Sequence, residues 1–149
     1  MNIIYCCSDG VYSSRIMAGI HLRQLPSDKI ASSKEILSLQ GFGNKKLKSG
    51  VVQYVGDDFY LNSIFTLAVK NDFKIVRKAI QDFLKLYSVS ADKFMLVESP
   101  KISSPWITVG GYLHDMGFFS TGNKLVVNSI RRNYPSFVKK VKEVLAQLD

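Results

Sequence analysis

The chain has 149 residues, enough for one domain with a sizeable core. Its 46% hydrophobic and 21% charged residues are ordinary for a globular protein, and no run approaches the roughly 20 apolar residues that span a bilayer. The net charge of +8 permits an anionic partner without requiring one.

The chain opens on a predicted buried strand, residues 2–6. A turn follows, and then a helix that is capped by Ser13 or Ser14 and runs to about Leu22. Residues 32–35 have the spacing of a capping box and predict a second, short helix.

Residues 51–55 and 64–69 are predicted to be strands, and the connection between them is too short for a crossover helix. We therefore expect an antiparallel hairpin. A helix is predicted over 73–87, with one apolar face formed by Phe73, Val76, Ile80, Phe83 and Tyr87. Another strand is predicted over 94–97.

Ser104 before Pro105 predicts the start of a further helix, which Gly117 ends. Residues 125–127 are interpreted as the last strand. The apolar stripe of the final helix consists of Phe137, Val141, Val144 and Leu148. This order predicts one three-layer α/β/α domain over residues 1–149, with a mostly parallel sheet of about five strands and one antiparallel hairpin.

Ligands of open α/β sheets bind beyond the carboxyl ends of the parallel strands, and helix amino termini there favour anions. Polar residues follow three predicted strands, so we expect a phosphate-bearing or other anionic small ligand at these loops. The candidate ligand-binding residues are Cys7, Ser8, Asp9, Gly10, Tyr12, Ser13, Ser14, Asp58, Glu98, Ser99, Ser104 and Asn128. Asp58 and Glu98 could hold a metal ion or a polar substrate group if their loops converge. The alternative is that the serines only cap helices.

The P-loop and dinucleotide motifs are absent, whereas the cysteine-phosphatase motif is incomplete and is only weakly supported. A P-loop needs a lysine that this chain lacks before Lys29, and the dinucleotide fingerprint fails because Gly10 is alone in its turn. A cysteine phosphatase needs Cys-x5-Arg, but the required position after Cys7 is Ser13, and Arg15 comes two residues late. Whether the chain is an enzyme, and with which cofactor, stays open.

The two histidines, His21 and His114, have no cysteine or carboxylate at ligand spacing, so no metal site is predicted, and both are expected at the surface or half-buried. Adjacent cysteines on a strand point to opposite faces. We expect Cys6 in the core and Cys7 near the ligand, with its pKa lowered by the next helix. A purely structural cysteine pair is the alternative.

Two other functions remain open. Phe59, Tyr60, Phe118 and Phe119 lie in predicted loops, where we favour burial in the core over a partner surface of a non-enzymatic interaction module. Charge-driven nucleic-acid binding is the weaker option, because no recognition motif appears. No membrane partner is expected, and the short apolar start without a basic stretch is not a secretory signal, so a cytoplasmic location is expected.

Segments along nearly the whole chain resemble domain of unknown function family 3189, a set of small bacterial proteins without an assigned activity. They are IIYCCSDGVYSSR, HLRQLPSDKI, VGDDFYLNSIFTLAV, SPWITVGGYLHDMG and KLVVNSIRRNYPSFVKKVKEVL. The family's first turn usually has two glycines followed by a histidine before the hydroxyl pair, where this chain has Asp9 and Tyr12. The resemblance therefore implies a fold more than a function.

Overall fold

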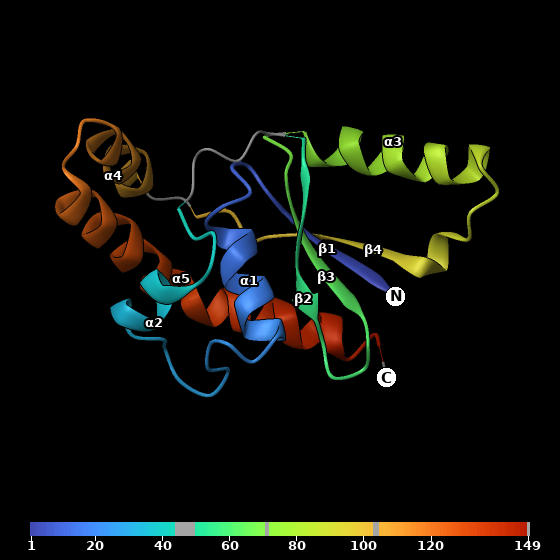
Figure 1. Ribbon diagram of the computed structural model, residues 1–149, viewed down its shortest axis with the longest axis horizontal. Coiled ribbons are helices and arrows are strands. Elements are labelled where there is room, and N and C mark those ends of the chain that lie inside the picture. Colours follow the sequence, from blue (N-terminus) through green and yellow to red (C-terminus); the bar gives the residue numbers. More distant parts are fainter. Residues whose placement is uncertain (44–49, 71, 103–104, 149) are drawn as a thin grey trace.

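The computed structural model describes residues 1–43, 50–70, 72–102 and 105–148. The elements in chain order are β1 (Asn2–Cys7), α1 (Ser13–His21), α2 (Ser33–Ser38), β2 (Val52–Asp57), β3 (Ser63–Ala68), α3 (Phe73–Leu86), the short 3-10 helix η1 (Ala91–Lys93), β4 (Phe94–Glu98), α4 (Pro105–Asp115) and α5 (Phe119–Leu145). Figure 1 shows α3 on the opposite side of the sheet from α1 and α2. Among the described helices, none is both long and apolar enough to cross a membrane.

The sheet is mixed, with strand order β2-β3-β1-β4. β1 is parallel to both of its neighbours, β3 and β4. β2 pairs with β3 in the antiparallel sense, with a register shift between Tyr54 and Gly56, which confirms the predicted hairpin. The predicted α/β class is therefore confirmed at the level of a mixed sheet with helices.

Alternate residues of β1 belong to two separate hydrophobic clusters. Ile3 and Tyr5 pack in the larger cluster, together with residues of α1 and α5. Ile4 and Cys6 pack in the smaller cluster. The helix α3 contributes Phe73, Val76 and Ile80 to this cluster. β1 is buried on both faces, as an apolar central strand of a parallel arrangement should be.

On the second face of the sheet, the residues of α3 that pack in the hydrophobic cluster all lie within 73–80. Phe83 and Tyr87, which the helical pattern placed on the buried face of α3, stack on each other with ring centroids 4.6 Å apart and are exposed. Leu84 is the buried residue of this helix. The three-layer arrangement is thus not confirmed.

The fifth strand predicted over 125–127 is wrong, because these residues lie inside α5. Val126 and Val127 are buried together with Ile130 and Tyr134, at the three- and four-residue spacing of one helix face. A run of three apolar residues cannot by itself distinguish a strand from a buried helix segment.

The sequence signals for the starts of α2 and α4 gave correct predictions. Ser32 and Glu35 form the predicted capping box: Glu35 N–H donates to Ser32 Oγ, and Ser32 N–H donates to the Glu35 carboxylate. α4 begins at Pro105 as expected, while the proposed cap, Ser104, lies outside the described residues.

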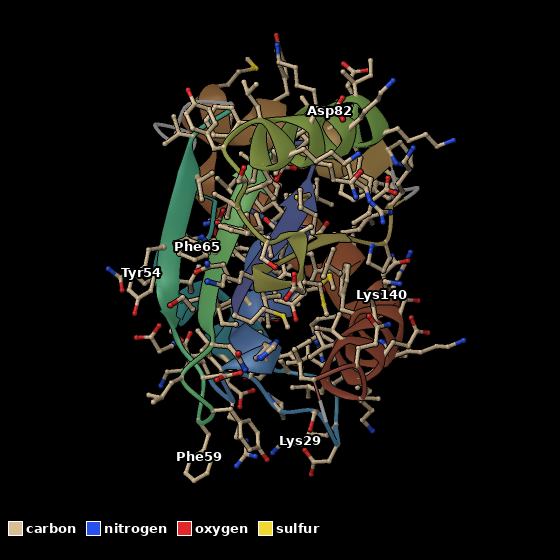
Figure 2. All side chains as sticks on the ribbon, turned by 90° about the vertical axis from the view of Figure 1, so that its right-hand side faces the viewer. Lys29, Tyr54, Phe59, Phe65, Asp82 and Lys140 are labelled. Carbon is tan, nitrogen blue, oxygen red and sulfur yellow. The ribbon has the colours of Figure 1, made fainter. Side chains whose placement is uncertain are left out.

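The β2–β3 connection contradicts the prediction that its aromatic residues are buried. Phe59 is 85% exposed, and Tyr60 and Leu61 are also exposed. Figure 2 shows Phe59 projecting away from the body of the molecule at the tip of this connection. Phe118 is exposed as well, and the side chain of Phe119 is not among those described.

Candidate functional site

The carboxyl ends of β1, β3 and β4 border a cavity of about 230 Å³. Backbone hydrogen bonds join these ends: Val69 N–H donates to Cys7 O at 2.9 Å, and Ser99 N–H donates to Cys6 O at 2.8 Å. The sequence-predicted residues in the cavity wall are Cys7, Ser8, Asp9, Tyr12, Ser13, Glu98 and Ser99. Two of the three predicted strand ends therefore meet.

The turn after β1 depends on Gly10. Its φ of +73° lies in the region that favours glycine, and an added Cβ would lie 2.9 Å from the Ala68 Cβ atom. Gly10 thus allows the turn to pack directly against the end of β3.

The predicted serine cap of α1 is wrong. Tyr12 occupies the capping position without a side-chain cap hydrogen bond, and Ser13 is already the first helical residue. The Oγ atom of Ser14 instead lies 3.1 Å from Cys7 Sγ. Ser14 therefore joins the helix to the thiol.

Three groups surround the sulfur of Cys7. Gly10 N–H donates to Sγ at 3.1 Å, Ser14 Oγ lies at 3.1 Å, and Asp9 Oδ1 lies at 3.3 Å. Burial, first, and the charge of Asp9, second, raise the pKa of the Cys7 thiol. Hydrogen bonds from Ser14 and Gly10 act in the opposite direction but are outweighed. The prediction of a lowered Cys7 pKa is therefore wrong.

Cys6 and Cys7 are both free thiols and both buried. Cys6 packs in the smaller cluster, as predicted. Burial, with smaller contributions from Cys7 and Glu98, raises the pKa of Cys6 to about 12. We therefore expect the Cys6 thiol to stay protonated at neutral pH.

The side chain of Asp9 forms hydrogen bonds within its own turn. Its Oδ1 atom accepts hydrogen bonds from Val11 N–H at 2.9 Å and Tyr12 N–H at 3.0 Å. The Tyr12 ring packs edge-on against Phe42, with centroids 5.5 Å apart. The carboxylate therefore occupies backbone donors that precede α1.

Ser99 presents a buried hydroxyl at the cavity. Its side chain belongs to a residue that is only 5% exposed, and its Oγ atom has no hydrogen-bond partner among the described residues. A buried hydroxyl without a hydrogen-bond partner costs stability.

Two lysines in the cavity wall were not predicted from the sequence. Lys70 follows β3, and Lys101 follows β4. Lys70 lies at this edge because β3, the second strand of the hairpin, pairs in parallel with β1. No pattern in the sequence indicates which strand of the hairpin makes that pairing.

Asp58 does not converge with Glu98. Asp58 precedes Ser63, which pairs with Asn2 at the start of β1, whereas Glu98 pairs with Cys6 near its end. The shared metal or substrate site proposed for these two carboxylates is therefore absent. Among the described residues, no cluster of three or more His, Cys, Asp or Glu could hold a metal ion.

Asp58 instead belongs to a buried polar chain. Its Oδ2 atom lies 3.1 Å from His21 Nε2, and Tyr5 Oη lies 2.6 Å from His21 Nδ1. Burial, followed by the charge of Asp58, raises the pKa of Tyr5 far above its ordinary value. The prediction of a surface or half-buried His21 is wrong, because α1 packs it against β1 and the hairpin. The side chain of His114 is not described.

The remaining candidates lie elsewhere. Asn128 is exposed on α5, which also carries Arg131 and Arg132, so the third predicted strand end does not exist. Ser104 lies outside the described residues. Gly10 and Ser14 contact Cys7 without bordering the cavity.

Arg15 points away from the thiol. Its Nη2 atom donates to Gln53 Oε1 at 2.6 Å, and its guanidinium lies beside Gly41. Burial lowers the pKa of Arg15. The arrangement of a Cys-x5-Arg phosphatase, in which thiolate and guanidinium meet on one phosphate, is therefore not formed by Arg15.

We compared the chain with family models, curated proteins and solved structures. No curated protein and no solved structure matches the chain. The family model described as Protein of unknown function (DUF3189) matches residues 2–146. The match covers nearly the whole chain, which therefore belongs to this family.

Proposed function

We propose that this protein binds a small ligand through a phosphate group or a similar oxyanion, in the cavity where β1, β3 and β4 end. The observation that carries the proposal is the buried, unpartnered hydroxyl of Ser99 in the cavity wall. The amino end of α1 borders the same cavity through Ser13, and helix amino termini favour negative charge.

The cavity wall is suited to such a group in charge and size. Lys70 and Lys101 supply positive charge, while Glu98 and Asp9 are its acidic members. A volume of about 230 Å³ is smaller than the roughly 300 to 1,000 Å³ of typical ligand sites. We therefore infer that the anionic group enters the cavity while the rest of the ligand extends toward solvent.

Thermal unfolding with orthophosphate and a panel of nucleotides and sugar phosphates tests this proposal. A ligand at 100 times its dissociation constant should stabilise the protein by about 2.7 kcal/mol. The double variant Lys70→Gln/Lys101→Gln should weaken binding about tenfold or more. The control Lys34→Gln/Lys93→Gln removes the same charge from exposed residues outside the cavity wall and should bind normally. The absence of any response, or equal losses in both variants, contradicts the site.

A second candidate function, an interaction module, is favoured by the exposed tip of the β2–β3 connection. Phe59 and Tyr60 lie edge-to-face, 5.6 Å apart, and are both exposed. Hydrogen bonds from Tyr60 N–H and Asn62 N–H to Asp58 Oδ1 close the loop beneath them. Large apolar residues held at an exposed tip are typical of a surface that meets a partner.

Affinity capture from the native host with Phe59→Ala/Tyr60→Ala tests the second candidate. The exposed pair Phe83→Ala/Tyr87→Ala on α3 is the matched control, because it removes the same kind of surface elsewhere. A partner lost only with the Phe59 and Tyr60 substitutions supports this function. Identical partners in both variants remove the hairpin tip from consideration.

A further inference from the structure

The turn that should bind an anion already contains one. Asp9 Oδ1 accepts hydrogen bonds from the N–H groups of Val11 and Tyr12, at 2.9 and 3.0 Å, and lies 3.3 Å from Cys7 Sγ. Gly10 N–H is engaged as well, with Cys7 Sγ. The chain's own carboxylate and thiol therefore satisfy three consecutive backbone donors at the amino end of α1.

We propose that the Asp9 carboxylate is an internal competitor for the ligand's oxyanion, and that it must leave the Val11 and Tyr12 N–H groups when the ligand binds. This inference rests on the proposed function and names the residue that limits affinity at that site. The independent sign of a ligand is Ser99, whose buried hydroxyl stays unpartnered while Asp9 is in place.

Electrostatics explains why the two anions exclude each other. Asp9 borders the cavity, so a phosphate there would face a second negative charge at short range, where like charges repel strongly. Asp9 is only partly buried and the preceding Ser8 is exposed, so the carboxylate has solvent to move into. Displacement would give its two backbone donors to the ligand.

The same movement changes the thiol. The charge of Asp9 is one of the causes that raise the Cys7 pKa, whereas hydrogen bonds with Ser14 and Gly10 lower this pKa. Without Asp9 beside it, Cys7 keeps these hydrogen bonds and loses the repulsion. Asp9 therefore controls both the affinity for the anion and the reactivity of the thiol.

Binding of orthophosphate to Asp9→Asn, measured by calorimetry, tests the proposal. This substitution keeps the shape of the side chain and removes its charge. We expect at least tenfold tighter binding than in the wild-type protein, together with faster alkylation of Cys7 by iodoacetamide. The control Asp57→Asn removes an equal charge at the far end of the sheet and should change neither quantity.

Each outcome distinguishes this inference from the proposed function. Equal or weaker phosphate binding by folded Asp9→Asn, while the wild-type protein binds, overturns the role of Asp9 and leaves the site intact. No binding by either protein overturns both. Should Asp9→Asn not fold, phosphate titration of the wild-type protein by NMR decides: the Val11 and Tyr12 amides must shift together with the Asp9 carboxyl carbon, and unmoved signals at a saturated site refute the displacement.

Discussion

Ser99 and Thr66 each bury a hydroxyl that has no hydrogen-bond partner among the described residues, yet only Ser99 borders the cavity. In the ligand-free protein both hydroxyls cost stability, because each lost its bonds to water on folding. Because Ser99 borders the cavity, we propose that its hydroxyl binds the ligand. Thr66 does not border the cavity, so we propose no such role for its hydroxyl.

We expect Ser99→Ala to leave the free protein as stable or to stabilise it by up to ~1 kcal/mol, because it removes an unsatisfied polar atom. The same change should weaken phosphate binding several-fold. Thr66→Val, the matched control, should also be neutral or stabilising but should leave binding unchanged. Chemical denaturation and phosphate titration of both variants give these two quantities. Unchanged phosphate binding in Ser99→Ala would contradict a role in the site.

At the residue scale, sequence reasoning found half of the residues in the cavity wall but misjudged the electrostatics of the wall. Strand alternation correctly placed Cys6 in the core, because it depends only on backbone geometry, although Cys6 also borders the cavity. The sign of the Cys7 pKa shift depends on where the Asp9 carboxylate folds and how deeply the sulfur is buried. Neither quantity can be obtained from spacing along the chain.

At the scale of elements, the chain Tyr5–His21–Asp58 ties the middle of β1 and the end of α1 to the β2–β3 connection. The side chain of Asp58 is only 5% exposed. Burial tends to raise its pKa, but hydrogen bonds from Asn62, His21 and Tyr60 together hold the pKa below its usual value.

This network predicts a loss of stability in acid. A carboxyl whose pKa is lower in the folded than in the unfolded chain stabilises the fold above the unfolded pKa, about 3.9 for aspartate, and this contribution disappears as the pH falls through the folded pKa. Asp58→Asn should cost about 1 to 3 kcal/mol at pH 7, because His21 loses its charged partner.

Urea unfolding between pH 7 and pH 3 measures the effect. The difference in stability between the wild-type protein and Asp58→Asn should shrink toward pH 3. Asp57→Asn, at the adjacent exposed carboxylate, is the control and should follow the wild-type profile. A constant difference across the range would show that the charge of Asp58 does not contribute.

Element prediction succeeded where the pattern was long or a cap was specific, and failed where an apolar run was short. The capping box at Ser32 and the hairpin each carry their own local signal. The segment 125–127 has no such signal, and its burial within α5 is decided by tertiary packing. Because residues 125–127 are helical, the predicted fifth strand does not exist, and neither does the predicted ligand-binding loop after it.

At the scale of the whole molecule, the topology gathers residues that the sequence separates widely. Lys70 and Lys101 border the same cavity as Cys7 because β1 lies between β3 and β4. Strand order is not encoded by periodicity, so the two lysines could not be assigned to the site from their surroundings in the chain. The predicted anion site thus gained its positive charges only from the fold.

The central position of β1 also has a consequence for synthesis. β1 leaves the ribosome well before its register partners, which are Ser63–Ala68 on one side and Phe94–Glu98 on the other. Parallel pairing over such separations is slow, and an apolar strand with two unpaired edges is prone to aggregate while it waits. The nascent chain therefore carries this apolar strand unprotected until β4 has emerged. Slower translation between β1 and β4 should prolong the exposure of the strand to chaperones and to other nascent chains.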